Sequence, residues 1–79
     1  MNLISSKELT EKHAISYQTL NFYTTLGLLK IQKRVGNRRY YDEDDTVARF
    51  GQIAQLKEEG YPLRIIVKQL NKEMVQQPK

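Results

Sequence analysis

The chain has 79 residues, 39% of them hydrophobic and 28% charged, so it folds as one small globular domain and has no room for a large enzyme's catalytic cavity. It contains no cysteine, no signal-peptide pattern at its N-terminus and no apolar run of membrane length, which argues against disulfides, thiol chemistry and membrane spans and predicts a cytoplasmic protein. Thirteen lysines and arginines against nine acids give a net charge of +4, which favours a polyanion as partner, although such bases can also serve solubility alone.

The N-terminal segment predicts a helix over about residues 6–12. Ser5-Ser6-Lys7-Glu8 has the pattern of a capping box, in which a serine hydroxyl and a glutamate carboxylate satisfy free backbone N–H groups. Ile4 and Leu9 stand at the two positions that form a hydrophobic staple. Two independent devices therefore place the start of this helix at the same point.

A second helix is predicted to start at Tyr17 and to end at Gly27. Ser16 can cap its first turn, and Gly27 suits the left-handed conformation that ends many helices. Two short helices joined by a tight turn form a helix-turn-helix, and we expect that motif here.

The segment after Gly27 predicts a small two-stranded β-hairpin that is mostly basic. Gly36 and Asn37 form a plausible turn pair between flanks that contain β-forming residues. Such a hairpin is not stable alone in water, so it must pack on the helices. Five bases and no acid lie between positions 30 and 39: Lys30, Lys33, Arg34, Arg38 and Arg39.

Two further helices are predicted in the second half of the chain. The acidic residues 42–45 offer capping groups for a helix that reaches about Glu59. Its expected buried side consists of Val47, Phe50, Ile53, Ala54 and Leu56. Pro62 fits the first turn of the last helix, and the apolar stripe of that helix is Leu63, Ile66, Val67, Leu70 and Met74. The domain should thus span residues 1–75, with a frayed tail at 76–79.

The second predicted helix has an outward face that suits contact with DNA bases. Its candidates for base contacts are Tyr17, Gln18, Asn21 and Phe22. A glutamine or asparagine amide can pair with an adenine edge through two hydrogen bonds, and an aromatic ring can touch a thymine methyl group. The alternative is that Phe22 is buried under the hairpin and that Gln18 is ordinary surface.

The basic hairpin offers candidates for contacts to the DNA backbone. Arg38 and Arg39 are neighbours in a strand, so their side chains diverge and together can bracket a phosphate strand. For one of them the alternative is an ion pair with the acidic residues 42–45. Tyr40 and Tyr41 alternate in the same way, which predicts one tyrosine in the core and one exposed. Lys57, near the end of the third helix, can reach a phosphate or merely complement the helix dipole.

The sequence gives little support for catalysis. His13 is the only histidine, and no acid, serine or cysteine stands at a spacing that would make a catalytic triad, so we expect a structural or surface role. Residues 42–45 lack the ligand spacing and central glycine of a calcium loop and are expected to cap a helix. We therefore expect no enzymatic activity, no metal and no cofactor.

The order and spacing of several short segments resemble the DNA-binding domain of the MerR family, the mercury-resistance-type regulators. The similarity runs from Ile4 to Leu70 and covers nearly the whole chain. The matching segments are Lys7-Glu8-Leu9, Ile15-Ser16-Tyr17-Gln18-Thr19-Leu20-Asn21-Phe22-Tyr23, Leu26-Gly27-Leu28-Leu29, Gly36-Asn37-Arg38-Arg39-Tyr40, Val47-Ala48-Arg49-Phe50-Gly51-Gln52-Ile53 and Leu56-Lys57-Glu58-Glu59-Gly60, followed by Leu63, Ile66 and Leu70.

The resemblance implies a mainly α winged helix-turn-helix with about four helices and a two-stranded hairpin as the wing. It also implies that the second helix enters the major groove while the wing and the third helix hold the DNA backbone. The expected backbone contacts are Ser16, Thr19, Tyr23, Arg34, Asn37, Arg38, Arg39, Tyr40 and Lys57.

The chain departs from the family pattern at three places. Asn21-Phe22-Tyr23-Thr24 stands where the family usually has Arg-Tyr-Tyr-Glu, which removes a positive charge and a phenolic hydroxyl. Ala14 replaces the usual turn glycine, and the segment between Tyr40 and Val47 is one or two residues longer than usual. The long dimerising helix and effector domain of promoter-activating members do not follow in this sequence.

The resulting expectation is sequence-specific binding of double-stranded promoter or operator DNA by a transcriptional regulator associated with the nucleoid. RNA polymerase is a possible further partner, and the isolated chain should be a monomer that dimerises on DNA or within a longer parent protein. Two alternatives are a small architectural protein of the excisionase or segregation type and a winged-helix module that binds proteins.

Overall fold

The computed structural model describes the backbone of residues 2–75 and the side chains of residues 2–71. The expectations for the Met74 side chain and for a frayed tail at residues 76–79 lie outside the described residues. In this range four helices and three strands follow one another as β1 (Leu3–Ser5), α1 (Ser6–His13), α2 (Tyr17–Thr25), β2 (Lys33–Val35), β3 (Arg38–Asp42), α3 (Glu43–Glu58) and α4 (Leu63–Val75). The predicted mainly α winged helix-turn-helix is confirmed.

The start of α1 is fixed by the predicted capping box. The Ser5 hydroxyl accepts a hydrogen bond from the Glu8 backbone N–H at 3.1 Å, and Glu8 Oε1 accepts one from the Ser5 N–H at 3.4 Å. Ile4 and Leu9 are both buried, as the staple requires. Local sequence alone therefore determines where this helix begins.

The turn between α1 and α2 contains a strained residue. Ala14 has φ +54° and lies in the left-handed region, and its N–H bonds to the Thr10 carbonyl to end α1. Ser16 then caps α2 by accepting a hydrogen bond from the Thr19 N–H at 3.1 Å. The departure from the usual glycine thus falls at a position where glycine is the residue without a steric penalty.

We expect Ala14→Gly to raise the free energy of unfolding by about 0.5–1 kcal/mol. The left-handed conformation costs an L-residue roughly 1–2 kcal/mol, while the greater flexibility of glycine in the unfolded chain returns about 0.4–1 kcal/mol of that gain. Urea denaturation measures the difference. Ala54→Gly, at an exposed position inside α3, is the matched control and should lose about 1 kcal/mol. A loss of stability in both variants would contradict the strain at Ala14.

The end of α2 is a Schellman motif centred on Gly27. Gly27 has φ +84°, its N–H bonds to the Thr24 carbonyl, and the Leu28 N–H bonds to the Tyr23 carbonyl, each at 3.0 Å. Leu28 is buried and makes the apolar end of the motif. This ending turns the chain out of α2 and toward the hairpin.

The sheet has three strands, and the predicted two-stranded wing is corrected in this respect. Its order is β1-β3-β2, with both neighbours antiparallel to β3. Ile4 lies opposite Tyr41 across β1 and β3, and Lys33 lies opposite Tyr40 across β2 and β3. The strand β1 has only three residues, too few to show an alternating pattern, and its partner strand, from Tyr40 to Asp42, lies on the far side of both α1 and α2 in the sequence.

The buried side of α3 differs from the predicted one. Ile53 is buried, as predicted, but Val47 and Ala54 are exposed. Thr46 and Glu43, which were not predicted to be buried, complete the buried side at the start of the helix. One residue advances the helix by about 100°, so Val47 and Ala54 lie just outside the stripe centred on Thr46 and Ile53. Phe50 and Leu56, also predicted as buried, pack against the core with part of their surface exposed.

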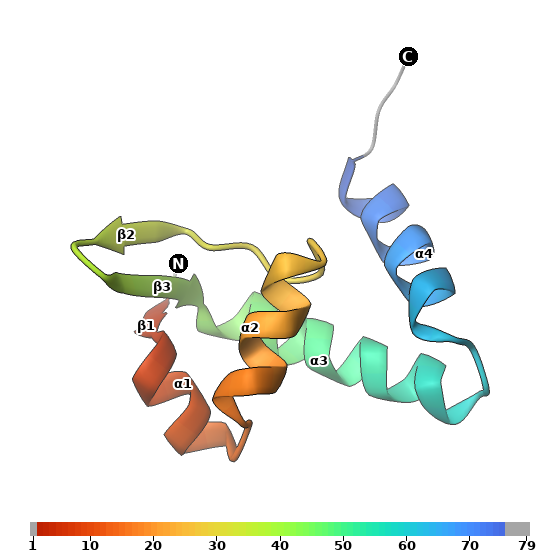
Figure 1. Cartoon of the computed structure of the whole chain (residues 1–79), viewed down its shortest axis with the longest axis horizontal. Coiled ribbons are helices and arrows are strands. Elements are labelled where there is room, and N and C mark those ends of the chain that lie inside the picture. The colour runs from red at the N-terminus through yellow and green to blue at the C-terminus, as the bar shows by residue number, and fades with distance from the viewer. Residues whose placement is uncertain (1, 76–79) are drawn as a thin grey trace.

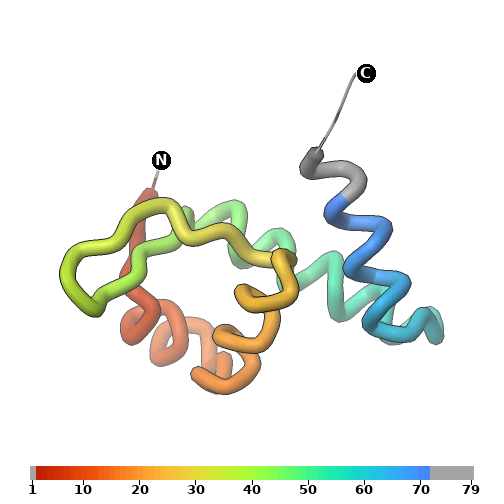
Figure 2. Tube along the Cα trace, turned by 45° about the horizontal axis from the view of Figure 1, so that its top comes forward, coloured from red at the N-terminus to blue at the C-terminus, as the bar shows by residue number. Residues whose placement is uncertain are grey.

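The last helix packs as its apolar stripe predicts. Ile66 and Leu70 are buried, and Leu63 and Val67 pack against the same core. Pro62 directly precedes α4, and its carbonyl accepts hydrogen bonds from the first turn of the helix. Figures 1 and 2 show α3 running from the sheet to α4, so the hairpin and α4 lie at opposite ends of the molecule.

Candidate nucleic-acid interface

The outward face of α2 is exposed, as predicted. Tyr17 and Phe22 keep 56% and 50% of their surface accessible, and Gln18 and Asn21 are exposed between them. The alternative in which Phe22 is buried under the hairpin is therefore wrong. Leu20, on the other side of the helix, is fully buried. Polar amides and aromatic rings thus share one accessible surface that is rigidly supported from behind.

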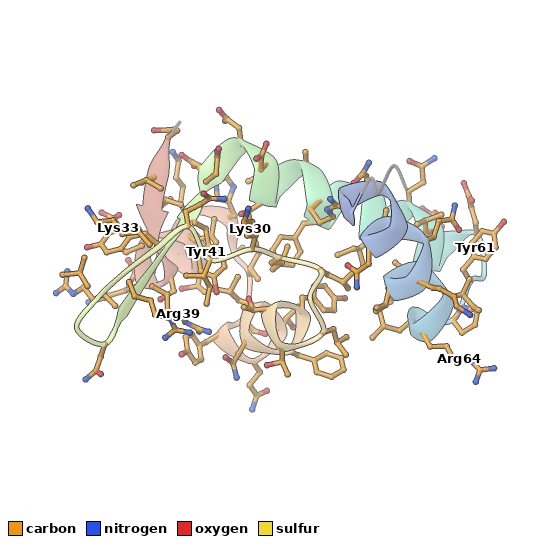
Figure 3. The ribbon with its side chains drawn as sticks, turned by 90° about the horizontal axis from the view of Figure 1, so that it is seen from above. Lys30, Lys33, Arg39, Tyr41, Tyr61 and Arg64 are labelled. Atoms are coloured by element: carbon orange, nitrogen blue, oxygen red, sulfur yellow. The ribbon has the colours of Figure 1, made fainter. Side chains whose placement is uncertain are left out.

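Arg39 reaches from β3 to this face of α2. Its Nη1 donates a hydrogen bond to Asn21 Oδ1 at 3.1 Å, and its Nη2 donates one to the Tyr17 hydroxyl at 2.9 Å. The guanidinium carbon also lies 5.6 Å from the centroid of the Tyr17 ring, within range of a cation–π interaction. Figure 3 shows Arg39 extending from the hairpin toward α2. The structure thereby joins two groups of residues that the sequence predicted separately.

Arg38 and Arg39 diverge, as neighbours in a strand should. Arg38 is exposed and lines a hollow over α1 together with Ser6 and Glu11, on the side away from Arg39. Across the hairpin, Arg34 lies directly opposite Arg39. Residues opposite each other in an antiparallel pair project from the same face of the sheet, so Arg34 and Arg39 place two positive charges on one face.

Neither predicted wing arginine forms an ion pair with the acidic run. Within the described side chains, both ion pairs go to Glu43, from Lys12 and from His13. The alternative in which Arg38 or Arg39 bonds to residues 42–45 therefore finds no support. The positive charge of the hairpin remains available to an external anion.

The other predicted backbone-contact residues fall into two groups. Arg34, Asn37 and Lys57 are exposed and free to meet a ligand, and Tyr40 is half-buried. Three more are engaged within the domain: Ser16 and Thr19 bond to each other in the cap of α2, and the Tyr23 ring is 8% exposed and packs 5.5 Å from the Phe50 ring. Thr19, Tyr23 and Lys57 nevertheless share one open hollow between α2 and α3, so these residues lie close together.

The tyrosine pair in β3 has one member in the core, as predicted, but the other is half-buried where the sequence predicted an exposed side chain. Tyr41 is fully buried, and its hydroxyl shares a 2.9 Å hydrogen bond with the Thr24 hydroxyl of α2. Tyr40 points away from the core and is half-buried. The bond from Tyr41 to Thr24 therefore fixes β3 against α2. This contact also supports the placement of Arg39, which lies on the same strand.

The acidic run caps α3, as predicted, and it also anchors α1, which the sequence did not predict. Asp42 Oδ1 accepts hydrogen bonds from the Asp44 and Asp45 N–H groups, at 3.1 and 3.5 Å. Glu43 is nearly buried and receives Lys12 Nζ at 2.9 Å and His13 Nε2 at 2.8 Å. His13 thus has the structural role that the sequence suggested.

The ion pairs shift the protonation of Glu43. Hydrogen bonds from Lys12 and then His13 hold the pKa of the Glu43 carboxyl below its ordinary value of 4.5, although burial opposes this effect. The same contact raises the pKa of Lys12 above 10.5. A carboxyl with a lowered pKa stabilises the fold when it is ionised, and the stabilisation disappears as the pH falls from 4.5 through the lower folded-state pKa.

We accordingly expect Glu43→Gln to lower the melting temperature at neutral pH and to have no effect in acid. The ionised carboxylate is the species that Lys12 and His13 stabilise, so protonation removes the difference between the parent and the variant. Thermal unfolding followed from neutral pH to below the folded-state pKa of Glu43 tests this. Glu58→Gln, at an exposed position on α3, should match the parent throughout. A difference that persists in acid would show that Glu43 acts through packing alone.

The described residues contain no group of three or more His, Cys, Asp or Glu side chains placed to hold a metal ion. None of their helices is both long and apolar enough to cross a membrane.

The link between Arg39 and α2 is what sequence reasoning missed. Asn21 and Arg39 are 18 positions apart, and Tyr17 and Arg39 are 22 apart. No local pattern connects them, because their contact depends on how the hairpin folds back over α2. The only hint was the coincidence of a polar outward face and a basic hairpin in the same small domain.

Comparison with known families gives one result. A family model described as MerR HTH family regulatory protein matches residues 4–73. No curated protein and no solved structure gives a significant match. The matched range includes the helix-turn-helix, the hairpin and most of α4, so it covers every residue of the candidate interface.

Proposed function

The chain belongs to the MerR HTH family of DNA-binding regulatory proteins, and from this we propose that it binds specific sites in double-stranded DNA and regulates transcription there. The observation that carries the proposal is the shared surface of α2 and the hairpin. On it, accessible amides and aromatic rings lie beside Arg34 and Arg39, which no carboxylate neutralises among the described side chains. A surface with base-reading groups and unneutralised guanidinium groups fits a DNA groove and its phosphates.

In the proposed complex α2 lies in the major groove and the hairpin lies over the adjacent backbone. Gln18 is the candidate for base pairing through its amide, and Tyr17 and Phe22 offer aromatic contacts to thymine methyl groups. Asn21, exposed on the same helix, is the second amide candidate. The candidates for backbone contact remain Ser16, Thr19, Tyr23, Arg34, Asn37, Arg38, Arg39, Tyr40 and Lys57.

The proposal is tested by selecting binding sites from a random duplex library with the whole chain. The selected duplex and a random duplex are then titrated over about 50–200 mM salt, where backbone contacts lose affinity steeply. We expect enrichment of a defined sequence and a negative salt slope on both duplexes. No enrichment with a steep slope would favour an architectural role, and no DNA binding would favour a protein partner.

The chain alone is proposed to be a monomer in solution and to pair only on a two-fold DNA site. Ile66 and Leu70 are buried in the core of the same domain. Among the described side chains, α4 therefore has little exposed apolar surface with which to bind a second copy. A stable coiled coil needs three or four heptads of apolar positions. Sedimentation at about 10 µM, where micromolar dimers become visible, should give a single monomeric species. A dimer in the absence of DNA would overturn this expectation.

Within a cell this function would place the protein in the cytoplasm on the nucleoid. RNA polymerase is a proposed further partner, since regulation at a promoter brings the two proteins to the same DNA.

A further inference from the structure

Arg39 is held in a defined position by two neutral side chains of α2. Long basic side chains at a surface ordinarily sample many rotamers, and ordering one costs about 0.5–1.5 kcal/mol on binding. Here Asn21 Oδ1 and the Tyr17 hydroxyl take one N–H each at 3.1 and 2.9 Å, and the Tyr17 ring lies against the guanidinium. Both partners are uncharged, so the positive charge of Arg39 is positioned without being neutralised.

The remaining donors of Arg39 suit an anion. A guanidinium has five N–H donors, and the two hydrogen bonds to α2 leave three of them. The Tyr17 hydroxyl accepts from Arg39 and keeps its own proton, which it can donate. Arg and tyrosine donors converging on one spot form a site for phosphate oxygens, which accept hydrogen bonds and carry the opposite charge.

The position of Arg34 points to the same ligand. Arg34 lies directly opposite Arg39 in the β2–β3 register, and like charges at such positions destabilise a hairpin. Within the described side chains no carboxylate pairs with either arginine. An external phosphate would relieve this repulsion, so the hairpin carries an electrostatic cost that DNA binding offsets.

We propose that Tyr17 and Asn21 position Arg39 for a DNA phosphate, so that Asn21 acts on DNA through Arg39 and does not read a base. This inference rests on the proposed function, since it specifies what part of the DNA the α2–hairpin junction recognises. Residue type and outward direction alone predicted that Asn21 contacts a base; here its role is to position Arg39. An asparagine whose amide oxygen already holds a guanidinium is committed to that partner, whereas Gln18, one turn earlier and outside this contact, keeps its amide for a base.

The test is a double-mutant cycle on two DNAs. The parent chain, Asn21→Ala, Tyr17→Phe, Arg39→Ala and the two double variants are titrated with the selected duplex and with a random duplex across the same salt range. Tyr17→Phe removes the hydroxyl and keeps the ring, and both α2 positions are exposed, so the fold should survive. Circular dichroism confirms this for each variant.

We expect Asn21→Ala and Tyr17→Phe to lower the affinity for both duplexes equally, by about three- to tenfold. Without these contacts the Arg39 side chain is not held in place beforehand, so it must be ordered on binding. In the Arg39→Ala background neither change should have a further effect. Arg39→Ala should make the salt slope shallower by about one, and Arg39→Lys should keep the slope without restoring the affinity, because a lysine retains the charge and lacks the fork.

Lys57 is the matched control, because it is an exposed base on α3 that makes no hydrogen bond to Arg39 or Asn21 among the described residues. Asn21→Ala combined with Lys57→Ala should be additive, as expected for independent sites. The inference is overturned if Asn21→Ala lowers the affinity for the selected duplex only, or if its loss of affinity adds in full to that of Arg39→Ala. Failure of the parent chain to bind either duplex would overturn the proposed function itself, and the two failures are therefore distinguishable.

Discussion

Replacing Arg38 and Arg39 together with alanine should weaken binding about a hundredfold on selected and random duplexes alike. Hydrogen bonds to charged groups contribute roughly 1.5–3 kcal/mol each, and both arginines are free of carboxylate partners among the described side chains. Because they diverge to opposite faces of the hairpin, they can contact separate phosphates. The salt slope should become shallower by about two, since each lost phosphate contact removes about one unit.

The control for this prediction removes the same net charge elsewhere. Lys30→Ala combined with Lys68→Ala also lowers the formal net charge by two, at exposed positions outside the hairpin. Figure 3 shows Lys30 on the loop before β2, on the side near α3 and away from Arg39. If both double variants change the slope equally, net charge is responsible and the hairpin has no special contact.

Gln18→Ala should cost about 1–3 kcal/mol on the selected duplex and almost nothing on random DNA. Gln18 is exposed on the face of α2 that Arg39 leaves open, and its amide can form two hydrogen bonds with an adenine edge. Removing the amide leaves the base edge unpaired in the complex, and this penalty arises only where the correct base is present. Competition titrations with the two duplexes measure the difference directly.

The matched control is Gln69→Ala, which removes an exposed glutamine from α4. It should leave both affinities unchanged. Equal losses on selected and random DNA for Gln18→Ala would mean that Gln18 contributes to the general grip of the protein and reads no base.

The end of the molecule where α3 meets α4 is remote from the candidate interface. Tyr61 lies in the turn between α3 and α4, and Arg64 lies in the first turn of α4, both away from the hairpin (Figure 3). Because the substituted positions Tyr17, Gln18 and Asn21 are exposed on α2, we expect the packing of α3 on α4 to be unchanged, so that losses of affinity can be assigned to the interface.

Much of the candidate site was predictable because it depends on residue type and on which way a helix faces. The exposure of Gln18 and Phe22 follows from the burial of Leu20 on the opposite side of the same helix. The divergence of Arg38 and Arg39 follows from the alternation of a strand. What these local rules could not reveal is which side chains from different elements meet.

The sequence by itself determined the features that are encoded within about five residues. The capping box at Ser5, the cap at Ser16 and the helix end at Gly27 all appear where the sequence predicts them, because each is a set of hydrogen bonds between near neighbours. The turn at Gly36 and the divergence of Tyr40 and Tyr41 to opposite sides of the strand follow from rules of the same short range, whereas packing decided that Tyr41 is the buried one.

Only the tertiary structure decided the contacts between distant segments. It added β1 as a third strand on β3, moved the buried stripe of α3 away from Val47, and brought Glu43 to Lys12 and His13. It also placed the Arg39 guanidinium on Asn21. Each of these depends on how the chain closes over tens of residues, and the free energy of such closure comes from burying the shared core, which no single segment of the sequence contains.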